Sequence, residues 1–411
     1  MRSQAFVYPW DVIGDPEAAE RIAGLGVDGV TLASSYHSTR ALTPRHPRHR
    51  IVVAEHAAVY YPVEEARWRG RALRPYPAGE WAGSGGPDAF GAAAEALRGA
   101  GLDVHAWVVL AHNSRLGAEH PSSVVRNAYG DRYGWAPCIG RPEVREYLVD
   151  LAAEAAARPG ATGVELESCG WYGLAHLHAH DKIGGVPLDG AAAYAMSLCF
   201  CESCGAGYAV LGAEPAALAR RVRDALAVVW SGEWRAGGDG EWADVERLLG
   251  AGDAELTLRH RLEVARELQS AAVSAVRAAT PGGFAVRLHA DPLPWRTGAN
   301  AGVEPEWLLS AEGGGADGLV LPCAGGLEAL TGAAAKAPEG ASLAANFTVV
   351  RGMGGAPERL AADLRAAQAA GATELRLYHA GLAGEADLAL VREALQAGSD
   401  SASDSGSAPG R

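Results

Sequence analysis

Three cysteines that could bind a metal stand close together in the middle of the chain. Cys199, Cys201 and Cys204 form a C-x-C-x2-C array. Thiols at this spacing lie near one another in almost any loop conformation, and thiolates suit a tetrahedral metal such as Zn²⁺. The array therefore predicts a metal site, with a redox pair as the alternative, because C-x2-C is also a thioredoxin-type spacing. The candidates for a fourth ligand are Cys138, Cys169, Cys323, His176, His178 and His180.

Two glutamates, Glu165 and Glu167, occupy alternate positions of an apolar run. Residues two apart on a strand point to the same side, and two close carboxylates cannot both ionise cheaply. One pKa then rises, as a general acid near neutral pH requires. We predict Glu167 as the catalytic acid and Asp291 or Glu165 as the second carboxylate. The alternatives are that Glu165 pairs with Arg287 or Arg376 inside the fold, and that Asp291, which precedes a proline, only starts a turn.

Three histidines alternate at His176, His178 and His180, shortly after Trp171 and Tyr172. In an extended segment they could ligate a metal. Their imidazoles and the neighbouring rings could instead offer hydrogen bonds and stacking faces to a polyhydroxylated ligand. A solvated loop without such a role is the third interpretation.

The elements that must position these groups alternate along the chain. Eight short apolar or β-branched runs are separated mostly by Ala-, Leu- and Arg-rich amphipathic stretches. This pattern predicts an α/β fold, a (β/α)₈ TIM barrel; a doubly wound open sheet would alternate similarly, but no glycine-rich dinucleotide fingerprint follows the first run. The predicted strands are Ala5–Tyr8, Gly29–Leu32, Val104–Leu110, Gly163–Leu166, Phe284–Leu288, Gly318–Leu321, Leu343–Phe347 and Glu374–Tyr378.

Two long insertions are predicted, at about 36–87 after strand two and about 168–253 after strand four. Both follow strands, which places them on the face where barrel active sites are built. The first is expected to hold a further extended run at 50–55. The barrel domain spans 1–397, and the polar low-complexity stretch 398–411 is predicted to be a disordered tail.

The carboxyl ends of barrel strands face a bound ligand, so polar and aromatic residues there form a shortlist of substrate-binding groups. Neighbouring loop residues join them. The residues predicted to bind substrate are Trp10, Tyr36, His37, His112, Asn113, Trp171, His178, His180, His289, Asn346 and Tyr378.

A basic, proline-broken run from Arg40 to Arg50 interrupts this acidic protein. It could bind an anionic group of a substrate. The alternative is a solvated loop ion-paired with acidic neighbours such as Glu64 and Glu65.

Composition excludes several kinds of partner. The net charge of −13 argues against nucleic acid and an anionic membrane, and no apolar run is long enough to span a bilayer. Six unevenly clustered cysteines and the absence of a signal-peptide pattern favour a reducing, cytoplasmic location. A homo-oligomer is possible, but the sequence does not set the oligomeric state.

The segment Trp135-Ala-Pro-Cys138-Ile-Gly-Arg-Pro142 and the helix start that follows it resemble the region after strand three of family 42 β-galactosidases. In that family this cysteine joins a later C-x-C-x2-C array to bind a structural zinc. The resemblance implies that Cys138, Cys199, Cys201 and Cys204 are the ligands here.

The order of motifs between Tyr129 and Tyr208 also resembles a set of barrel proteins grouped as hypothetical glycoside hydrolases. The chain departs from family 42 in two places. Glu167 is followed by Ser168-Cys169 instead of belonging to an Asn-Glu pair, and strand seven carries Asn346 where the family has a glutamate nucleophile. The resemblance thus implies a barrel, zinc and a carbohydrate ligand more directly than it implies hydrolysis.

Three functions follow as hypotheses. The first is a glycoside hydrolase that uses carboxylate general acid and base chemistry on a carbohydrate and holds a structural zinc. The second is a catalytically degenerate barrel that binds carbohydrate without turnover. The third is a metal-dependent hydrolase that uses the histidine-rich loop.

Overall fold

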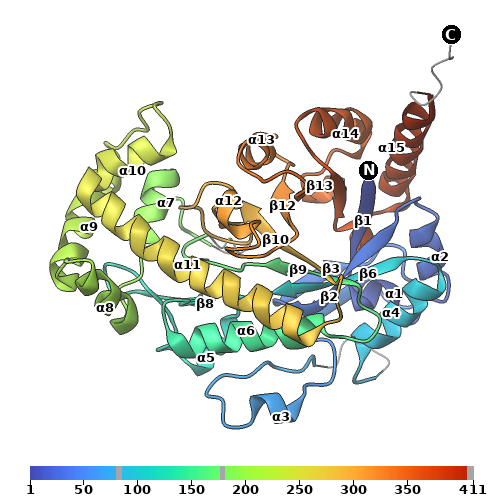
Figure 1. Ribbon diagram of the computed structural model, residues 1–411, viewed down its shortest axis with the longest axis horizontal. Coiled ribbons are helices and arrows are strands. Elements are labelled where there is room, and N and C mark those ends of the chain that lie inside the picture. Colours follow the sequence, from blue (N-terminus) through green and yellow to red (C-terminus); the bar gives the residue numbers. More distant parts are fainter. Residues whose placement is uncertain (80–85, 176–180, 405–411) are drawn as a thin grey trace.

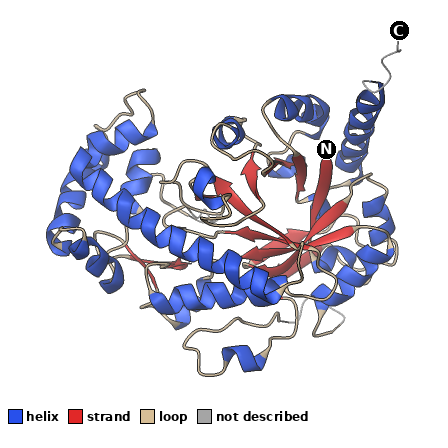
Figure 2. Cartoon of the chain, in the orientation of Figure 1, coloured by secondary structure: helices blue, strands red, loops and turns tan. Residues whose placement is uncertain are grey.

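The computed structural model describes residues 1–79, 86–175 and 181–404, with side chains to residue 397. Within this part of the chain eight parallel strands close into a barrel surrounded by helices (Figures 1 and 2). Every strand predicted from the sequence is present. The barrel strands are β1 (Arg2–Val7), β2 (Gly29–Tyr36), β6 (Asp103–Val109), β9 (Gly163–Glu167), β10 (Ala285–Asp291), β12 (Gly318–Pro322), β13 (Ser342–Thr348) and β14 (Glu374–Tyr378).

Closure of the barrel excludes the open-sheet alternative. β1 pairs in parallel with β14 on one side, where Gln4 lies opposite Arg376, and with β2 on the other, where Gln4 lies opposite Gly29. Because both faces of each strand are covered, the strands are almost completely buried, as β2 and β9 are along their whole lengths.

The helices cover the outside of the barrel, and α6 illustrates why the sequence forms them. Pro142 occupies the first turn, where its fixed φ suits the helix and no N–H is needed, and Glu143 follows at the positive end of the helix dipole. Val144, Leu148 and Leu151 share one buried face at helical spacing. Helices outside the insertions are α1 (Pro9–Val12), α2 (Ala18–Ala23), α4 (Ala89–Gly99), α5 (Ser114–Glu119), α6 (Pro142–Ala156), α12 (Pro305–Leu308), α13 (Glu328–Ala334), α14 (Leu360–Ala369) and α15 (Glu385–Asp404), with 3₁₀ turns η1 (Arg351–Met353), η2 (Pro357–Arg359) and η3 (Ala380–Leu382).

The first insertion contains the hairpin of β3 (Thr39–Leu42) and β4 (Ile51–Ala54), then β5 (Ala58–Val59) and α3 (Glu65–Trp68). β4 lies within the extended run expected at 50–55. A buried carboxylate attaches the first insertion to α6. Glu154 accepts hydrogen bonds from the Trp68 indole at 2.9 Å and from the Tyr61 hydroxyl at 3.3 Å.

The second insertion is helical, with α7 (Gly190–Met196), α8 (Glu202–Val210), α9 (Pro215–Trp230) and α10 (Glu241–Leu249), and α11 (Ala251–Ala279) follows it and leads to β10. Figure 1 shows α8, α9 and α10 gathered beside the barrel, while the long α11 runs back along α6. Three short strands complete the described fold: β7 (Val124–Arg126) pairs with β8 (Arg132–Pro137), and β11 (Ala301–Gly302) pairs with β10.

The end of the chain differs in part from the predicted tail. Helix α15 continues to Asp404, because no proline interrupts the backbone before Pro409, and 405–411 lie outside the described residues. None of the described helices combines the length and the apolar composition that crossing a membrane requires.

Candidate active site and candidate metal centre

Glu167 lies at the carboxyl end of β9 with 3% of its surface exposed. The indole N–H of Trp107 on β6 donates to its Oε2 at 2.8 Å, and Nδ1 of His289 lies 4.0 Å from the same oxygen. Burial raises the pKa of Glu167, an effect that the charge of His289 and the Trp107 hydrogen bond partly oppose. Ser168 follows with φ of 57°, a left-handed conformation that is uncommon for a side-chain-bearing residue and ends the strand abruptly.

Glu165 lies deeper in the barrel, where the alternative interpretation of this residue is the one observed. Its Oε1 accepts from Nε of Arg376 at 2.7 Å, and both side chains are fully buried. His105 and His289 each approach a carboxylate oxygen to 3.5 Å. Burial alone would raise the pKa of Glu165, but Arg376 and the two histidines hold it well below its usual range. Glu165 is therefore an ionised structural group, which argues against the predicted catalytic role.

Aromatic side chains surround Glu167. The Tyr8 hydroxyl contacts the Tyr36 hydroxyl at 3.0 Å and Nδ1 of His379 at 2.9 Å. The ring of Trp107 lies 4.6 Å from that of Tyr36 and 5.6 Å from that of Tyr378 between centroids. These rings give the end of the barrel apolar faces with hydroxyl and imidazole groups at their edges, a combination suited to sugar rings.

A second row of rings continues from this cluster. His37 stacks on Tyr36 with centroids 4.1 Å apart, His112 lies 4.8 Å from His37, and Tyr172 stacks on His112 at 4.4 Å. After burial, the charge of the Glu167 carboxylate is the next cause that raises the pKa of Tyr36, of Tyr172 and of Tyr378. The row therefore lies around the carboxylate.

Asp291 and Asn346 end two further strands. Asp291, on β10, accepts from the backbone N–H of Leu293 at 2.9 Å and lies 3.7 Å from Nε of Arg296. Burial raises its pKa, against the lowering effects of that N–H and of Arg296. The predicted turn is thus present, and the carboxyl group remains partly exposed. Asn346 on β13 is 8% exposed, and its Oδ1 makes no hydrogen bond to a described residue.

Three predicted binding residues have partners within the fold. Asn113 caps α5, because its Oδ1 accepts from the N–H of Leu116 at 2.9 Å. Trp10 is fully buried and stacks on Tyr8. Trp171 is buried on the side of α11, where its indole N–H donates to the carbonyl of Arg261 at 2.9 Å.

Two other predicted binding residues, His178 and His180, lie outside the described residues, as does His176. The basic run contacts neither Glu64 nor Glu65 through any hydrogen bond or ion pair among the described residues. Arg45 donates to the carbonyls of Ala380, Gly381 and Ala383, and His46 contacts the carbonyl of Ile13 at 2.9 Å. The run therefore ties the first insertion to the loops after β1 and β14.

The four cysteines implied by the family resemblance meet in one cluster. Sγ of Cys138 lies 3.5 Å from Cys199, 3.7 Å from Cys201 and 3.6 Å from Cys204, and all four residues are buried. Four sulfurs arranged tetrahedrally around zinc at about 2.3 Å would be about 3.8 Å apart. Hydrogen bonds with Cys199 and Cys201 raise the pKa of Cys138 well above its usual value, an effect that Cys204 partly opposes. The cluster fits a tetrahedral metal.

The other two cysteines lie apart from this cluster. Burial raises the pKa of Cys169 to about 12 and that of Cys323 to about 11, so both are protonated thiols at neutral pH. Neither belongs to a group of described residues that could hold a metal.

Tyr8 and Trp107 are the site residues that the sequence reasoning missed. Trp107 occupies the same face of β6 as His105, two residues away, so strand alternation applied to the glutamates would also have found it. Tyr8 follows the last residue of β1 and gave no signal beyond its position.

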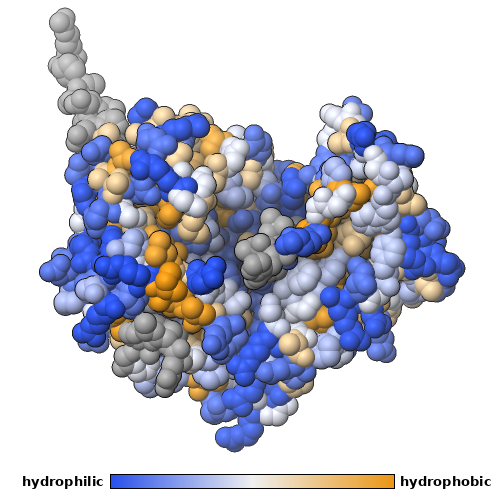
Figure 3. Space-filling view, turned by 180° about the vertical axis from the view of Figure 1, so that it is seen from behind, coloured by the Kyte–Doolittle hydropathy of each residue, from blue (hydrophilic) through white to orange (hydrophobic). Residues whose placement is uncertain are grey.

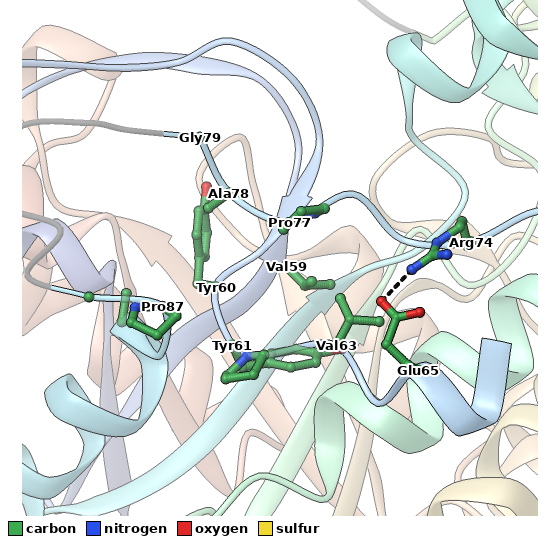
Figure 4. A pocket seen from close by; sticks show the side chains of 13 residues that line it. Val59, Tyr60, Tyr61, Val63, Glu65, Arg74, Pro77, Ala78, Gly79 and Pro87 are labelled. Atoms are coloured by element: carbon green, nitrogen blue, oxygen red, sulfur yellow. Dashed lines mark hydrogen bonds and ion pairs between the residues drawn. The ribbon is translucent and has the colours of Figure 1, made fainter. Parts of the chain in front are cut away.

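A separate cavity of about 470 Å³ lies in the first insertion (Figure 4). Tyr60, Tyr61 and Val63 line it, and Arg74 and Glu65 form an ion pair of 2.6 Å at its edge. The ring of Tyr60 packs against Trp10 at 5.6 Å, so the cavity lies behind the aromatic cluster. On the opposite side from the view of Figure 1, the surface is hollowed between the second insertion and the rest of the barrel (Figure 3).

Solved structures of carbohydrate-active enzymes share this architecture. The catalytic domain of β-amylase from Paenibacillus polymyxa superposes with a TM-score of 0.54 at 13% identity, over 96% of this chain and 98% of that one. The PgaB (BpsB) glycoside hydrolase domain from Bordetella bronchiseptica gives 0.50 at 15% identity, with 96% and 98% covered. The chain has the fold of glycoside hydrolases.

An α-L-fucosidase, isoenzyme 2 from Paenibacillus thiaminolyticus, gives a TM-score of 0.53 at 14% identity. That comparison covers 98% of this chain, which spans 50% of the fucosidase. No protein-family profile matches the sequence, and no curated protein matches it. The similarity to family 42 β-galactosidases is therefore limited to the motifs quoted above.

Proposed function

We propose that the protein is a glycoside hydrolase in which Glu167 is the general acid. The observation that carries the proposal is a buried carboxyl group of raised pKa at the end of β9, ringed by Tyr36, Tyr172 and Tyr378. A carboxylic acid of raised pKa can give its proton to the glycosidic oxygen as the bond to the sugar breaks. The aromatic rings would hold the sugar by stacking and by hydroxyl contacts.

Asp291 is the proposed second carboxylate, because Glu165 is held in its ion pair with Arg376. A carboxylate about 5 Å from the acid would attack the sugar and retain its configuration, whereas one at roughly 6.5 to 9.5 Å would activate a water and invert it. The anomeric form of the first product, followed by NMR, distinguishes the two.

Glu167→Gln tests the assignment, because the amide keeps the shape of the side chain but has no acidic proton to give. We expect turnover of alkyl glycosides, whose poor leaving groups need protonation, to fall by a factor of about 100 or more, since general acid catalysis contributes about 10² to 10⁴. Glu263→Gln, an exposed site on α11, is the control and should retain full activity. An unchanged rate in the Glu167 variant would reject the proposal.

A carbohydrate-binding protein without turnover is the second candidate. It is favoured by Asn346, which places an amide at the end of β13 where the family resemblance implies a glutamate nucleophile. Calorimetric binding of sugars that the wild-type chain does not hydrolyse, together with loss of binding in Tyr36→Ala, would support this function over hydrolysis.

We propose zinc as the ion of the cysteine cluster and assign it a structural role. Four thiolate ligands leave no open coordination position for a substrate or a water. Cys138, Cys199, Cys201 and Cys204 would hold the ion, which would join the loop before α6 to the second insertion.

A further inference from the structure

Arg261, on α11, is a buried cation without a carboxylate partner. Only 2% of the residue is exposed, and Nε, Nη1 and Nη2 make no hydrogen bond of regular geometry to a described residue, although the neutral Tyr194 hydroxyl lies close enough to oppose the fall in the pKa of Arg261. No ion pair joins it to a carboxylate within the ranges that the structure describes, although other arginines of the same helix have such partners: Arg266 pairs with Glu304 at 2.6 Å. A buried guanidinium in this state is costly unless a negative charge lies nearby.

The surroundings of Arg261 are aromatic. Its guanidinium carbon lies 4.9 Å from the centre of the Tyr194 ring and 5.6 Å from that of Trp171. These contacts offset part of the desolvation cost but supply no full counter-charge. They place the guanidinium beside Tyr194 of α7 and beside Trp171, which follows β9.

The cysteine cluster lies close enough to Arg261 for their charges to interact. The charge of Cys204 raises the pKa of Arg261. The charges of Cys204, Cys199 and Arg261 all affect the pKa of Tyr208. Trp171 links the two regions: its ring and the sulfurs of Cys138 and Cys204 all border Gly140, and its indole N–H donates to the backbone carbonyl of Arg261.

A divalent metal with four thiolates carries a net charge of −2, and such a buried dianion requires positive neighbours as much as Arg261 requires a negative one. We propose that Arg261 is a buried counter-charge of the metal-loaded cysteine cluster, in addition to the partly exposed Arg141 beside Cys201, and that it is a positioning residue that stabilises the bound metal through its charge. The inference rests on the metal site proposed above. It goes beyond that site because it assigns the stabilisation of the metal to a residue outside the ligand set.

Arg261→Met separates this role from a general contribution to folding. We expect zinc affinity, measured by competition with a chromophoric chelator, to fall about tenfold or more, because one unit charge near a dianion is lost. The metal-free variant should be at least as stable to urea as metal-free wild type, since the unpaired charge is gone. The matched control, Arg266→Met on the same helix, should keep zinc affinity within about twofold.

Two further variants keep the test decisive. Arg261→Lys retains the charge and should bind zinc more tightly than Arg261→Gln, which has a neutral side chain; this comparison replaces the first if the methionine variant does not fold. Unchanged zinc affinity in the neutral variants would overturn the role of Arg261 while leaving the metal site intact. A wild-type chain that binds no zinc would overturn both.

Discussion

At the scale of single residues, the environment of Glu167 separates it from Glu165 although the two lie two positions apart on one strand. Burial raises the pKa of Glu167 and so favours its protonated form, although the Trp107 N–H and His289 partly oppose this effect. Glu165 meets the guanidinium of Arg376, so its charged form is favoured. The sequence predicted that the two pKa values would diverge, but repulsion between the carboxylates is not the cause. The cause is the distant Arg376, which strand spacing cannot reveal.

Trp107→Phe tests the electrostatic description of Glu167. The indole N–H stabilises the carboxylate, so its removal should raise the pKa of Glu167 further, by about 1 unit for a hydrogen bond to a charged group. The basic limb of the pH dependence of kcat/KM should then move upward by about 1 unit. The control is Trp68→Phe, which removes the same kind of bond to the buried Glu154 and should leave the limb in place. A basic limb that does not move would contradict the role of Glu167 as the acid.

At the scale of elements, the barrel strands were predictable because each is a short apolar run that two neighbouring strands and a helix bury. Sequence periodicity predicts such strands because the pattern is local. It does not predict which polar groups meet across the barrel. Glu165 and Arg376, for example, are in contact only because β1 pairs with both β14 and β2 and closes the barrel. Nor does it show that Asn113 caps a helix, because a strand-end position and an N-cap position coincide there.

Glu165→Gln tests the interior ion pair, because it removes one of the two carboxylates that pair with the buried Arg376, while Glu374 remains at 2.8 Å. We expect a loss of about 1.5 to 3 kcal/mol in the free energy of unfolding by urea, as for a hydrogen bond to a charged group. Glu263→Gln, whose partner Arg259 is exposed, should cost no more than about 1 kcal/mol. Joint replacement of Glu165 and Arg376 by methionine should recover much of the loss. A single variant as stable as the control would show that the pair contributes little.

The same pair predicts how stability depends on pH. The folded pKa of Glu165 lies below its unfolded value of about 4.3, so its contribution is complete above that value and is lost as the pH falls through the folded pKa. The free energy of unfolding of the wild type, measured with urea, should therefore decrease progressively below about pH 4. In Glu165→Gln this part of the pH dependence should be absent, and an identical acid profile in both proteins would contradict the depressed pKa.

At the scale of the whole molecule, the cysteine cluster is the point where the second insertion is fixed to the barrel. Cys138 follows β8 and precedes α6, whereas the other three cysteines lie at the junction of α7 and α8. The C-x-C-x2-C spacing was sufficient to predict three of these neighbours, because they are local. Choosing Cys138 over Cys169 required the family resemblance, and Arg261 gave no signal, since its burial beside the cluster is set by the packing of α11.

Removal of the metal should therefore loosen the insertion and not merely empty a site. Cys201→Ser should lose zinc and melt at a lower temperature; at a free zinc concentration about 1,000 times Kd, the ion alone stabilises the fold by about 4 kcal/mol. A strong chelator should shift wild type to the melting temperature of the variant. Cys169→Ala, which removes a buried thiol outside the cluster, should keep its zinc and its response to the chelator. Full zinc occupancy with unchanged melting in Cys201→Ser would refute the structural role, because a metal that bridges two segments cannot lose a ligand without weakening the connection between them.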